Sequence, residues 1–222
     1  MAYIWECFVV SGVLQSVFMN MRSFITPPNI GDAYEGGFFA GQISTTADGV
    51  ATHNLVVAPL ATGQSTLKWK TSSSSTAGTS SVIDGPTNSS NMNNATHPAA
   101  QFCEALTIGG YTDWYMPARN ELIVEYYFLK PTTVSNNTGH GSNAYAVSPE
   151  PISTNYSSGS PAQTSATIFQ TGNSEAFSDT NWWSSTTYNA TNAWRQYFGN
   201  GFQFVNYKTS LFYVRAVRRV AI

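Results

Sequence analysis

Two long polar stretches limit where the core of this chain can come from. Residues 71–94 consist mostly of Ser, Thr, Asn and Gly, and residues 132–175 are again polar and rich in turn-forming residues. Such segments contribute little apolar surface, so we expect both to be long surface loops. The second should contain a short element near Ile168 and Phe169. The core must then be assembled from the blocks before, between and after these stretches.

The first and middle blocks predict different kinds of element. Apolar runs bounded by turn residues predict strands in the first block, at residues 34–43, 53–60 and 67–70. In the middle block, a helix capped by Thr96 or His97 is predicted to begin at Pro98. A second helix is predicted over residues 118–129, and Pro131 stops it.

The last block predicts a meander of strands. Its four predicted strands cover residues 182–186, 192–198, 202–208 and 212–220. Gly199-Asn200-Gly201 lies between the middle two and is a strong hairpin signal. Strands, then helices, then strands predict an α+β domain in which two helices pack on antiparallel sheets joined by long surface loops. Its first and last strands can pair in one sheet.

The N-terminal residues predict a separate segment. Residues 1–25 are largely apolar, but Gln15, Ser16 and Asn20 interrupt the run, so we expect no membrane span. No positive charge precedes the run, which argues against a secretory signal. We expect residues 1–29 to be an apolar arm ending in a Pro-rich hinge, and residues 30–222 to be the domain. The arm is expected to serve assembly or anchoring by burying itself in a neighbouring subunit; the alternative is that it folds back on its own domain. The apolar residues assigned to the arm's contacts are Tyr3, Trp5, Phe8, Val10, Leu14 and Phe18.

The charge composition favours some partners and excludes others. Charged residues make up 10% of the chain and the formal net charge is −2, whereas an average soluble domain has about 25% charged residues. A surface of hydroxyls and amides suits a protein that works outside the cytosol, in an assembly or against sugars. The chain has no basic stripe to contact phosphates, so nucleic acid is not an expected partner.

Neither a cofactor nor a metal site is predicted, and we do not expect an enzyme. The three histidines are scattered through a strand, a cap and a loop, and no serine has a marked base beside it. The chain has only five Asp, whereas a calcium site needs clustered oxygen ligands. Cys7 and Cys103 lie far apart, and two interpretations stay open: two free, buried thiols, or a disulfide.

Two segments carry a family resemblance. They are GGYTDWYMPARNEL at residues 109–122, and WWSSTTYNATNAWRQYF followed by VRAVRR within residues 182–219. Together they resemble a bacterial and phage domain family that also forms the C-terminal domain of bacterial collagen-like adhesins. The resemblance implies a C-type-lectin-like fold for residues 30–222, related to formylglycine-generating enzymes and to the variable proteins of diversity-generating retroelements. It does not reach the N-terminal arm, and it implies a fold better than an activity.

The residues of these segments have structural interpretations of their own. Asp113 can accept backbone or arginine hydrogen bonds before the helix that Pro117 opens, and Glu121 can pair with Arg119 or a C-terminal arginine. Ser184, Ser185 and Thr186 are expected to satisfy backbone groups at a strand end. The side chains predicted for the core are Trp114, Trp183, Trp194 and Val214. The arginines expected to be paired at the end of a sheet are Arg215, Arg218 and Arg219.

A candidate ligand surface lies in residues 188–208, where aromatic and amide side chains interleave. Tyrosine offers rigid contact area and asparagine offers adaptable hydrogen bonds, a combination found in binding surfaces. In retroelement-diversified relatives, a similar region of this fold is the variable ligand face. Because successive side chains of a strand point to opposite faces, about half of these side chains are expected to point into the core. The alternative to a ligand surface is therefore a hairpin whose outward face contacts only solvent. The predicted ligand contacts are Tyr188, Asn189, Asn192, Gln196, Asn200, Phe202, Gln203, Asn206, Tyr207 and Lys208.

The resemblance and the composition lead to three functional hypotheses. The favoured one is a non-enzymatic bacteriophage tail or fibre-tip protein that binds a host cell-surface glycan or protein as a homo-oligomer such as a trimer. The first alternative is a structural virion protein, on the capsid or the tail surface, anchored to other virion proteins by its arm. The second alternative is a secreted bacterial adhesin. The first two place the protein on the surface of an extracellular virus particle.

Overall fold

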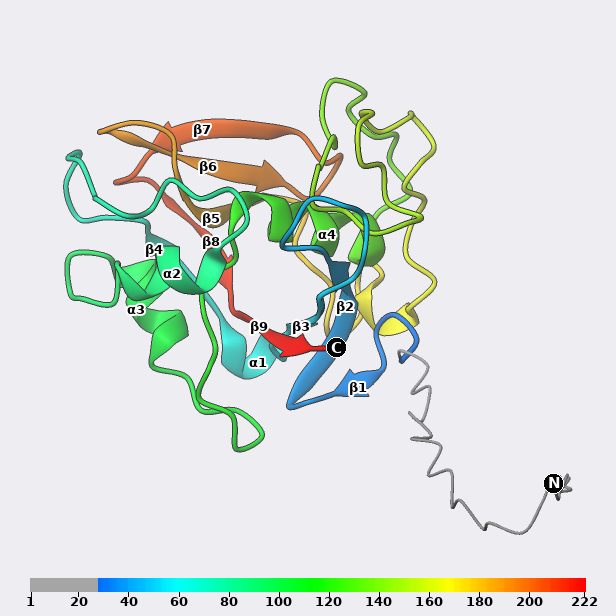
Figure 1. Cartoon of the computed structure of the whole chain (residues 1–222), viewed down its shortest axis with the longest axis horizontal. Coiled ribbons are helices and arrows are strands. Elements are labelled where there is room, and N and C mark those ends of the chain that lie inside the picture. Colours follow the sequence, from blue (N-terminus) through cyan, green and yellow to red (C-terminus); the bar gives the residue numbers. More distant parts are fainter. Residues whose placement is uncertain (1–27) are drawn as a thin grey trace, which may run out of the picture.

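Two sheets form the framework of the computed structural model, which describes residues 28–222 (Figure 1). The four-stranded sheet has the order β1-β2-β3-β9, and the five-stranded sheet has the order β4-β8-β5-β6-β7. All pairs are antiparallel except β5 with β8. The strands are β1 (Ala33–Tyr34), β2 (Gly37–Ile43), β3 (His53–Val57), β4 (Gln64–Lys68), β5 (Asn181–Thr187), β6 (Asn192–Tyr197), β7 (Gln203–Tyr207), β8 (Leu211–Arg215) and β9 (Val217–Ala221).

Few helices accompany the sheets, and the predicted α+β class is confirmed. The longest helix, α4, packs against β2 of the first sheet and against β5 and β6 of the second, so it joins the two sheets. Both helices predicted from the sequence form, as α3 and α4. The helices are α1 (Leu60–Gly63), α2 (Gly85–Ser90), α3 (Pro98–Glu104), α4 (Arg119–Leu129) and the 3-10 turn η1 (Thr167–Phe169).

The last predicted strand, residues 212–220, is two strands in the structure. β8 ends at Arg215 in the five-stranded sheet, and β9 begins at Val217 beside β3 in the other sheet. Between them, Ala216 accepts a hydrogen bond from the Ala58 amide and donates one to the Gly63 carbonyl oxygen, each at 2.9 Å. No turn-forming residue interrupts residues 212–220, so the sequence does not reveal this change of sheet. The pairing of β9 with β3 confirms that strands from the two ends of the domain share one sheet.

The polar stretches are not simply surface loops. Residues 85–90 form α2, whose N-cap Asp84 accepts the Thr87 amide at 3.2 Å and whose first turn contains Pro86. The N-cap Asp84 and Pro86 are signals for the start of a helix. The helix was not predicted, because the surrounding residues are rich in Ser and Thr and indicated a loop. Several side chains of the two stretches are buried, and they include Thr79, Asn88, Met92, Asn136, Glu150 and Tyr156.

Close packing of α4 on β2 depends on a glycine. β2 has an irregular register between Phe39 and Gly41, and Gly41 has a φ of +120°. A Cβ atom at Gly41 would lie 2.5 Å from the Phe128 ring of α4. Both the backbone conformation and the contact therefore require a residue without a side chain.

Three of the four predicted core residues are confirmed. Trp114, Trp183 and Val214 are fully buried, in an apolar cluster that also contains Cys103. Trp194 is only half-buried, so its placement in the core was wrong. It lies on β6, one strand from the edge of the sheet, and its ring contacts the Arg119 guanidinium and the exposed Tyr188 instead of the core.

The Cys103 thiol is buried, and burial raises its pKa well above the ordinary value. Only the thiolate reacts with alkylating reagents. In a Cys7→Ser variant we therefore expect native protein to resist iodoacetamide at pH 8 for hours, whereas protein in urea is alkylated within minutes. Mass spectrometry measures the modified fraction. Rapid modification of the native protein would contradict the burial of this side chain.

Within residues 28–222, the structure has no helix that is long and apolar enough to cross a membrane. The arm residues Tyr3, Trp5, Phe8, Val10, Leu14 and Phe18 lie outside the described residues, as does Cys7. The assembly role of the arm therefore stays a prediction, as does the domain boundary near Ile30.

Candidate functional site

The β6–β7 hairpin forms where the sequence predicts it. Its turn is closed by the Tyr197 amide, which donates to the Phe202 carbonyl oxygen at 2.9 Å. Paired residues on neighbouring strands present their side chains on the same face. Asn192 pairs with Tyr207 and Trp194 with Val205 on one face, whereas Arg195 pairs with Phe204 on the other. The predicted ligand surface is therefore divided between two faces.

Exposed aromatic side chains are concentrated in this region. Among the described residues, the strongly exposed aromatic side chains are Tyr188, Phe204 and Tyr207, with exposed fractions of 56%, 53% and 62%. All three lie between residues 188 and 207. Tyr207 shares its face with Trp194, and Phe204 points to the opposite face.

We call the surface formed by Tyr188, Asn192, Trp194 and Tyr207 the aromatic face. The Tyr188 ring packs edge-on against Trp194 with centroids 5.4 Å apart, and the Tyr188 amide donates to the Asn192 carbonyl oxygen at 3.0 Å. The Arg119 guanidinium lies 4.0 Å from the centroid of Trp194. A cation placed over an indole in this way is attracted by its π-electrons, which holds both side chains in place.

Arg119 joins the aromatic face to the start of α4. Its Nη2 donates to Gln203 Oε1 at 3.1 Å, and Thr186 Oγ1 accepts its backbone amide at 3.0 Å. Among the described residues, no carboxylate forms an ion pair with Arg119. Burial lowers the pKa of its guanidinium. The sequence prediction missed Arg119 as part of this surface, because its segment lies about 70 residues before the hairpin.

Five of the predicted ligand contacts have other roles in the structure. Gln196, Gln203 and Lys208 are buried, so their assignment to the ligand surface was wrong. Asn189 Oδ1 accepts hydrogen bonds from the backbone amides of Thr191 and Asn192, and Asn200 Oδ1 accepts one from the Phe202 amide. These two asparagine side chains therefore stabilise turns. The remaining predicted contacts, which are at least partly accessible, are Tyr188, Asn192, Phe202, Asn206 and Tyr207.

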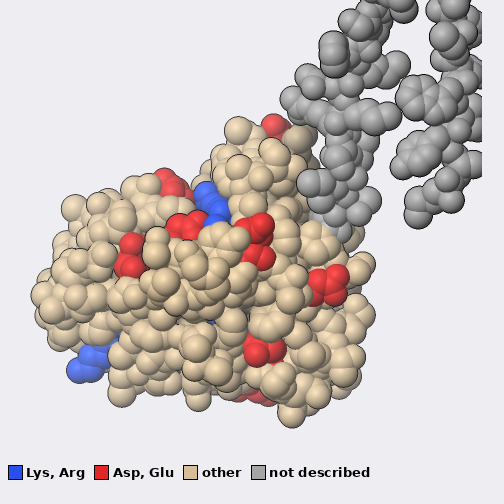
Figure 2. All heavy atoms as spheres, turned by 90° about the horizontal axis from the view of Figure 1, so that it is seen from below, with Lys and Arg blue, Asp and Glu red and all other residues tan. Residues whose placement is uncertain are grey.

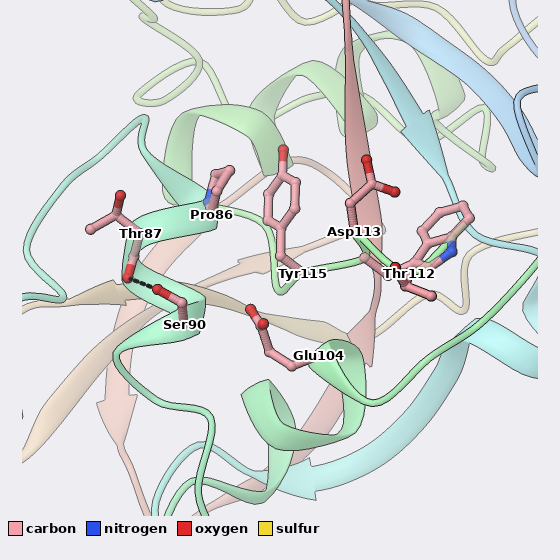
Figure 3. Close-up of a pocket in the computed structure, with 8 residues that line it drawn as sticks. Pro86, Thr87, Ser90, Glu104, Thr112, Asp113 and Tyr115 are labelled. Atoms are coloured by element: carbon pink, nitrogen blue, oxygen red, sulfur yellow. Dashed lines mark hydrogen bonds between the residues drawn. The ribbon is translucent and has the colours of Figure 1, made fainter. Parts of the chain in front are cut away.

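A second candidate site is a pocket between α2, the C-terminal end of α3 and residues 112–115 (Figure 3). It has a volume of about 350 Å³. α2 supplies Pro86, Thr87 and Ser90 to one wall, and Figure 3 shows the Glu104 carboxylate directed toward the space between this helix and Tyr115. The other lining residues are Thr112, Asp113 and Trp114. No sequence pattern indicated this pocket, because α2 itself was not predicted.

The two carboxylates that line the pocket differ in their partners. Asp113 accepts two hydrogen bonds from Arg218, at 2.7 and 3.0 Å. Glu104 has no ion-pair partner among the described residues, and burial raises the pKa of its carboxyl while the nearby Ser89 hydroxyl opposes that rise. Across residues 28–222, no three or more His, Cys, Asp or Glu side chains are grouped to hold a metal ion.

The sequence profile of the Lcl C-terminal domain matches residues 61–218 of this chain, which is more than half of its length. This chain belongs to the Lcl C-terminal domain family. The match confirms the resemblance carried by residues 109–122 and by the tryptophan- and arginine-rich C-terminal segments. No curated protein matches the chain.

In this Lcl C-terminal domain, ion pairs of the three C-terminal arginines hold the C-terminal strands to the rest of the fold. Asp113 pairs with Arg218, Glu121 accepts Arg219 Nε at 2.8 Å, and Arg215 pairs with Glu175. The prediction that the three C-terminal arginines are paired is thus confirmed. Arg119 was the other partner considered for Glu121, and it contacts Trp194 and Gln203 instead.

The hydroxyl residues of β5 also have structural roles in this Lcl C-terminal domain. Ser184 Oγ donates to the Trp194 carbonyl oxygen at 3.0 Å, and Thr186 Oγ1 donates to that of Ser81 at 2.8 Å. Satisfying backbone groups was the predicted role, but these residues lie within a buried strand and not at its end. Pro117 is also buried, and its carbonyl oxygen accepts the Ser185 amide at 2.7 Å.

Proposed function

We propose that this protein is a non-enzymatic binding module with a C-type-lectin-like fold that attaches a bacteriophage particle to a host cell-surface glycan or protein. In this proposal the aromatic face contacts the ligand, and copies of the chain assemble through the N-terminal arm on the particle surface. The Lcl C-terminal domain family supports a role in adhesion. Two sheets, one of which joins the two ends of the domain, and long connections between β4 and β5 are compatible with the lectin-like fold.

One observation carries the proposal: the aromatic face. Tyr188 and Tyr207 are more than half exposed, and they flank a tryptophan that Arg119 holds in place. Large, rigid aromatic side chains supply contact area at a low entropic cost, and they dominate the binding energy of many interfaces. Asn192 lies between them and adds an amide for hydrogen bonding. Among the described residues, the one other strongly exposed aromatic ring is Phe204, on the opposite face of the hairpin. On the face drawn in Figure 2, uncharged residues predominate.

We expect the double variant Tyr188→Ala, Tyr207→Ala to bind susceptible host cells at least tenfold more weakly than the wild-type protein. Such a loss corresponds to about 1.4 kcal/mol or more, which is the effect of removing an interface anchor. Binding is measured with fluorescently labelled full-length protein on whole cells, and a glycan array tests for a sugar ligand. Trp194 stays in place in this variant, so the fold is preserved.

The matched control is Phe204→Ala, which removes an equally exposed aromatic ring from the opposite face of the hairpin. We expect its binding to stay within twofold of the wild type. Equal losses in both variants would indicate a general effect of surface apolarity and contradict the assignment to one face. Absence of binding to every host tested would overturn the proposed function.

A further inference from the structure

We propose that the pocket between α2, α3 and residues 112–115 is a second, independent binding site for a small polyhydroxylated ligand that carries a protonated amine, such as an amino sugar. This site does not depend on the aromatic face or on the function proposed for it. The inference rests on the shape of the pocket, on the groups that line it and on the uncompensated charge of Glu104.

The pocket is large enough for a small ligand, and both polar and apolar groups line it. Its volume of about 350 Å³ falls in the lower part of the range of small-molecule sites. Thr87, Ser90 and Thr112 line it from two sides, and the Ser90 hydroxyl donates to the Thr87 carbonyl oxygen at 3.2 Å while its oxygen can still accept a hydrogen bond (Figure 3). Such hydroxyls both donate and accept hydrogen bonds, so they match the hydroxyls of a polyol. Pro86 and Tyr115 contribute apolar surface against which the carbon atoms of a ring can pack.

Charge determines which polyol the pocket prefers. Arg218 neutralises Asp113 through two hydrogen bonds. Glu104 lines the same pocket and has no cationic partner among residues 28–222. Its carboxyl has a raised pKa because burial removes water from the charged form. A ligand ammonium group beside Glu104 would replace that lost solvation with a charge-assisted hydrogen bond.

The probe for this site is glucosamine, compared with glucose and N-acetylglucosamine. The three sugars have nearly the same ring, but at neutral pH glucosamine alone carries an ammonium group. Binding to full-length protein is followed by amide chemical-shift perturbation in NMR titrations. We expect glucosamine to perturb residues 86–90, 104 and 112–115, with an affinity at least fivefold higher than that of either neutral sugar.

Glu104→Gln tests the role of the charge, because glutamine keeps the shape of the side chain. We expect this variant to lose at least fivefold in glucosamine affinity and to bind glucose as the wild type does. Asp179→Asn, which removes an exposed carboxylate outside the pocket, serves as the control and should bind normally. Glucosamine affinity should also fall as the pH is lowered and Glu104 becomes protonated.

The remaining outcomes overturn the inference. If no sugar perturbs the pocket residues, or if glucose and glucosamine bind equally well, the pocket is not a site for amines. If Glu104→Gln binds glucosamine as the wild type does, Glu104 does not provide the recognition. Ser90→Trp fills the pocket without altering Glu104, and unchanged binding in this variant would place the ligand elsewhere. The variant Tyr188→Ala, Tyr207→Ala should keep its glucosamine binding, which separates failure of this inference from failure of the proposed function.

Discussion

Replacing Glu121 with alanine is expected to lower the free energy of unfolding by about 3–5 kcal/mol, because it leaves a largely buried arginine without its partner. The Glu121 carboxylate is fully buried and accepts hydrogen bonds from the Tyr115 hydroxyl, from the Ala118 amide at 2.7 Å and from Arg219 Nε at 2.8 Å. The variant loses the link between β9 and the start of α4. Urea denaturation at pH 7, followed by tryptophan fluorescence, measures the change.

Glu35→Ala is the matched control for this prediction. Glu35 also reaches a C-terminal arginine, but its carboxylate is partly exposed and lies 3.5 Å from Arg218, which keeps Asp113 as its main partner. Exposed ion pairs contribute at most about 1 kcal/mol, so a small effect is expected. A loss below 1 kcal/mol in Glu121→Ala would show that the buried network is not what holds β9 in place.

Replacing Glu150 with glutamine is expected to stabilise the protein by up to about 4 kcal/mol at pH 8 and to leave it nearly unchanged at pH 4. Glu150 is buried; its Oε1 accepts a hydrogen bond from Asn143 at 3.1 Å, and its Oε2 has no partner among the described residues. Burial raises its pKa from 4.5 to about 8. The folded protein therefore holds a proton that the unfolded chain releases above pH 4.5.

The sign of the pH dependence follows from this raised pKa. The stability contributed by the protonated carboxyl is complete below pH 4.5 and is lost as the pH rises to about 8. Thermal melts of the wild type between pH 4 and 8.5 should show this decline, and in Glu150→Gln the decline should be smaller. A residual slope is expected, because burial also raises the pKa of Glu125. Parallel curves for the two proteins would contradict a buried, protonated Glu150.

The sequence predicted the elements whose pattern is local. The strand runs in the first block, the two helices that begin near Pro98 and Ala118, and the hairpin at Gly199-Asn200-Gly201 all form near their expected positions. Each depends on side-chain spacing, a cap or a turn residue within a few positions of the chain. The paired C-terminal arginines were also predictable, because arginines within an apolar strand require acceptors.

What the sequence by itself determined is therefore the α+β class, most of the elements and the family. Tertiary structure alone decided which face each polar side chain occupies. Gln203 and Tyr207 lie on the same face of β7, yet Gln203 is buried where it accepts a hydrogen bond from Arg119, and Tyr207 is exposed. Gln196 and Lys208 are also buried, and Lys208 lies over the Trp69 ring. The tertiary structure also divides residues 212–220 between two sheets, and it brings α2 beside Glu104 to form a pocket. These features depend on contacts between residues far apart in the chain, which no local pattern of side chains encodes.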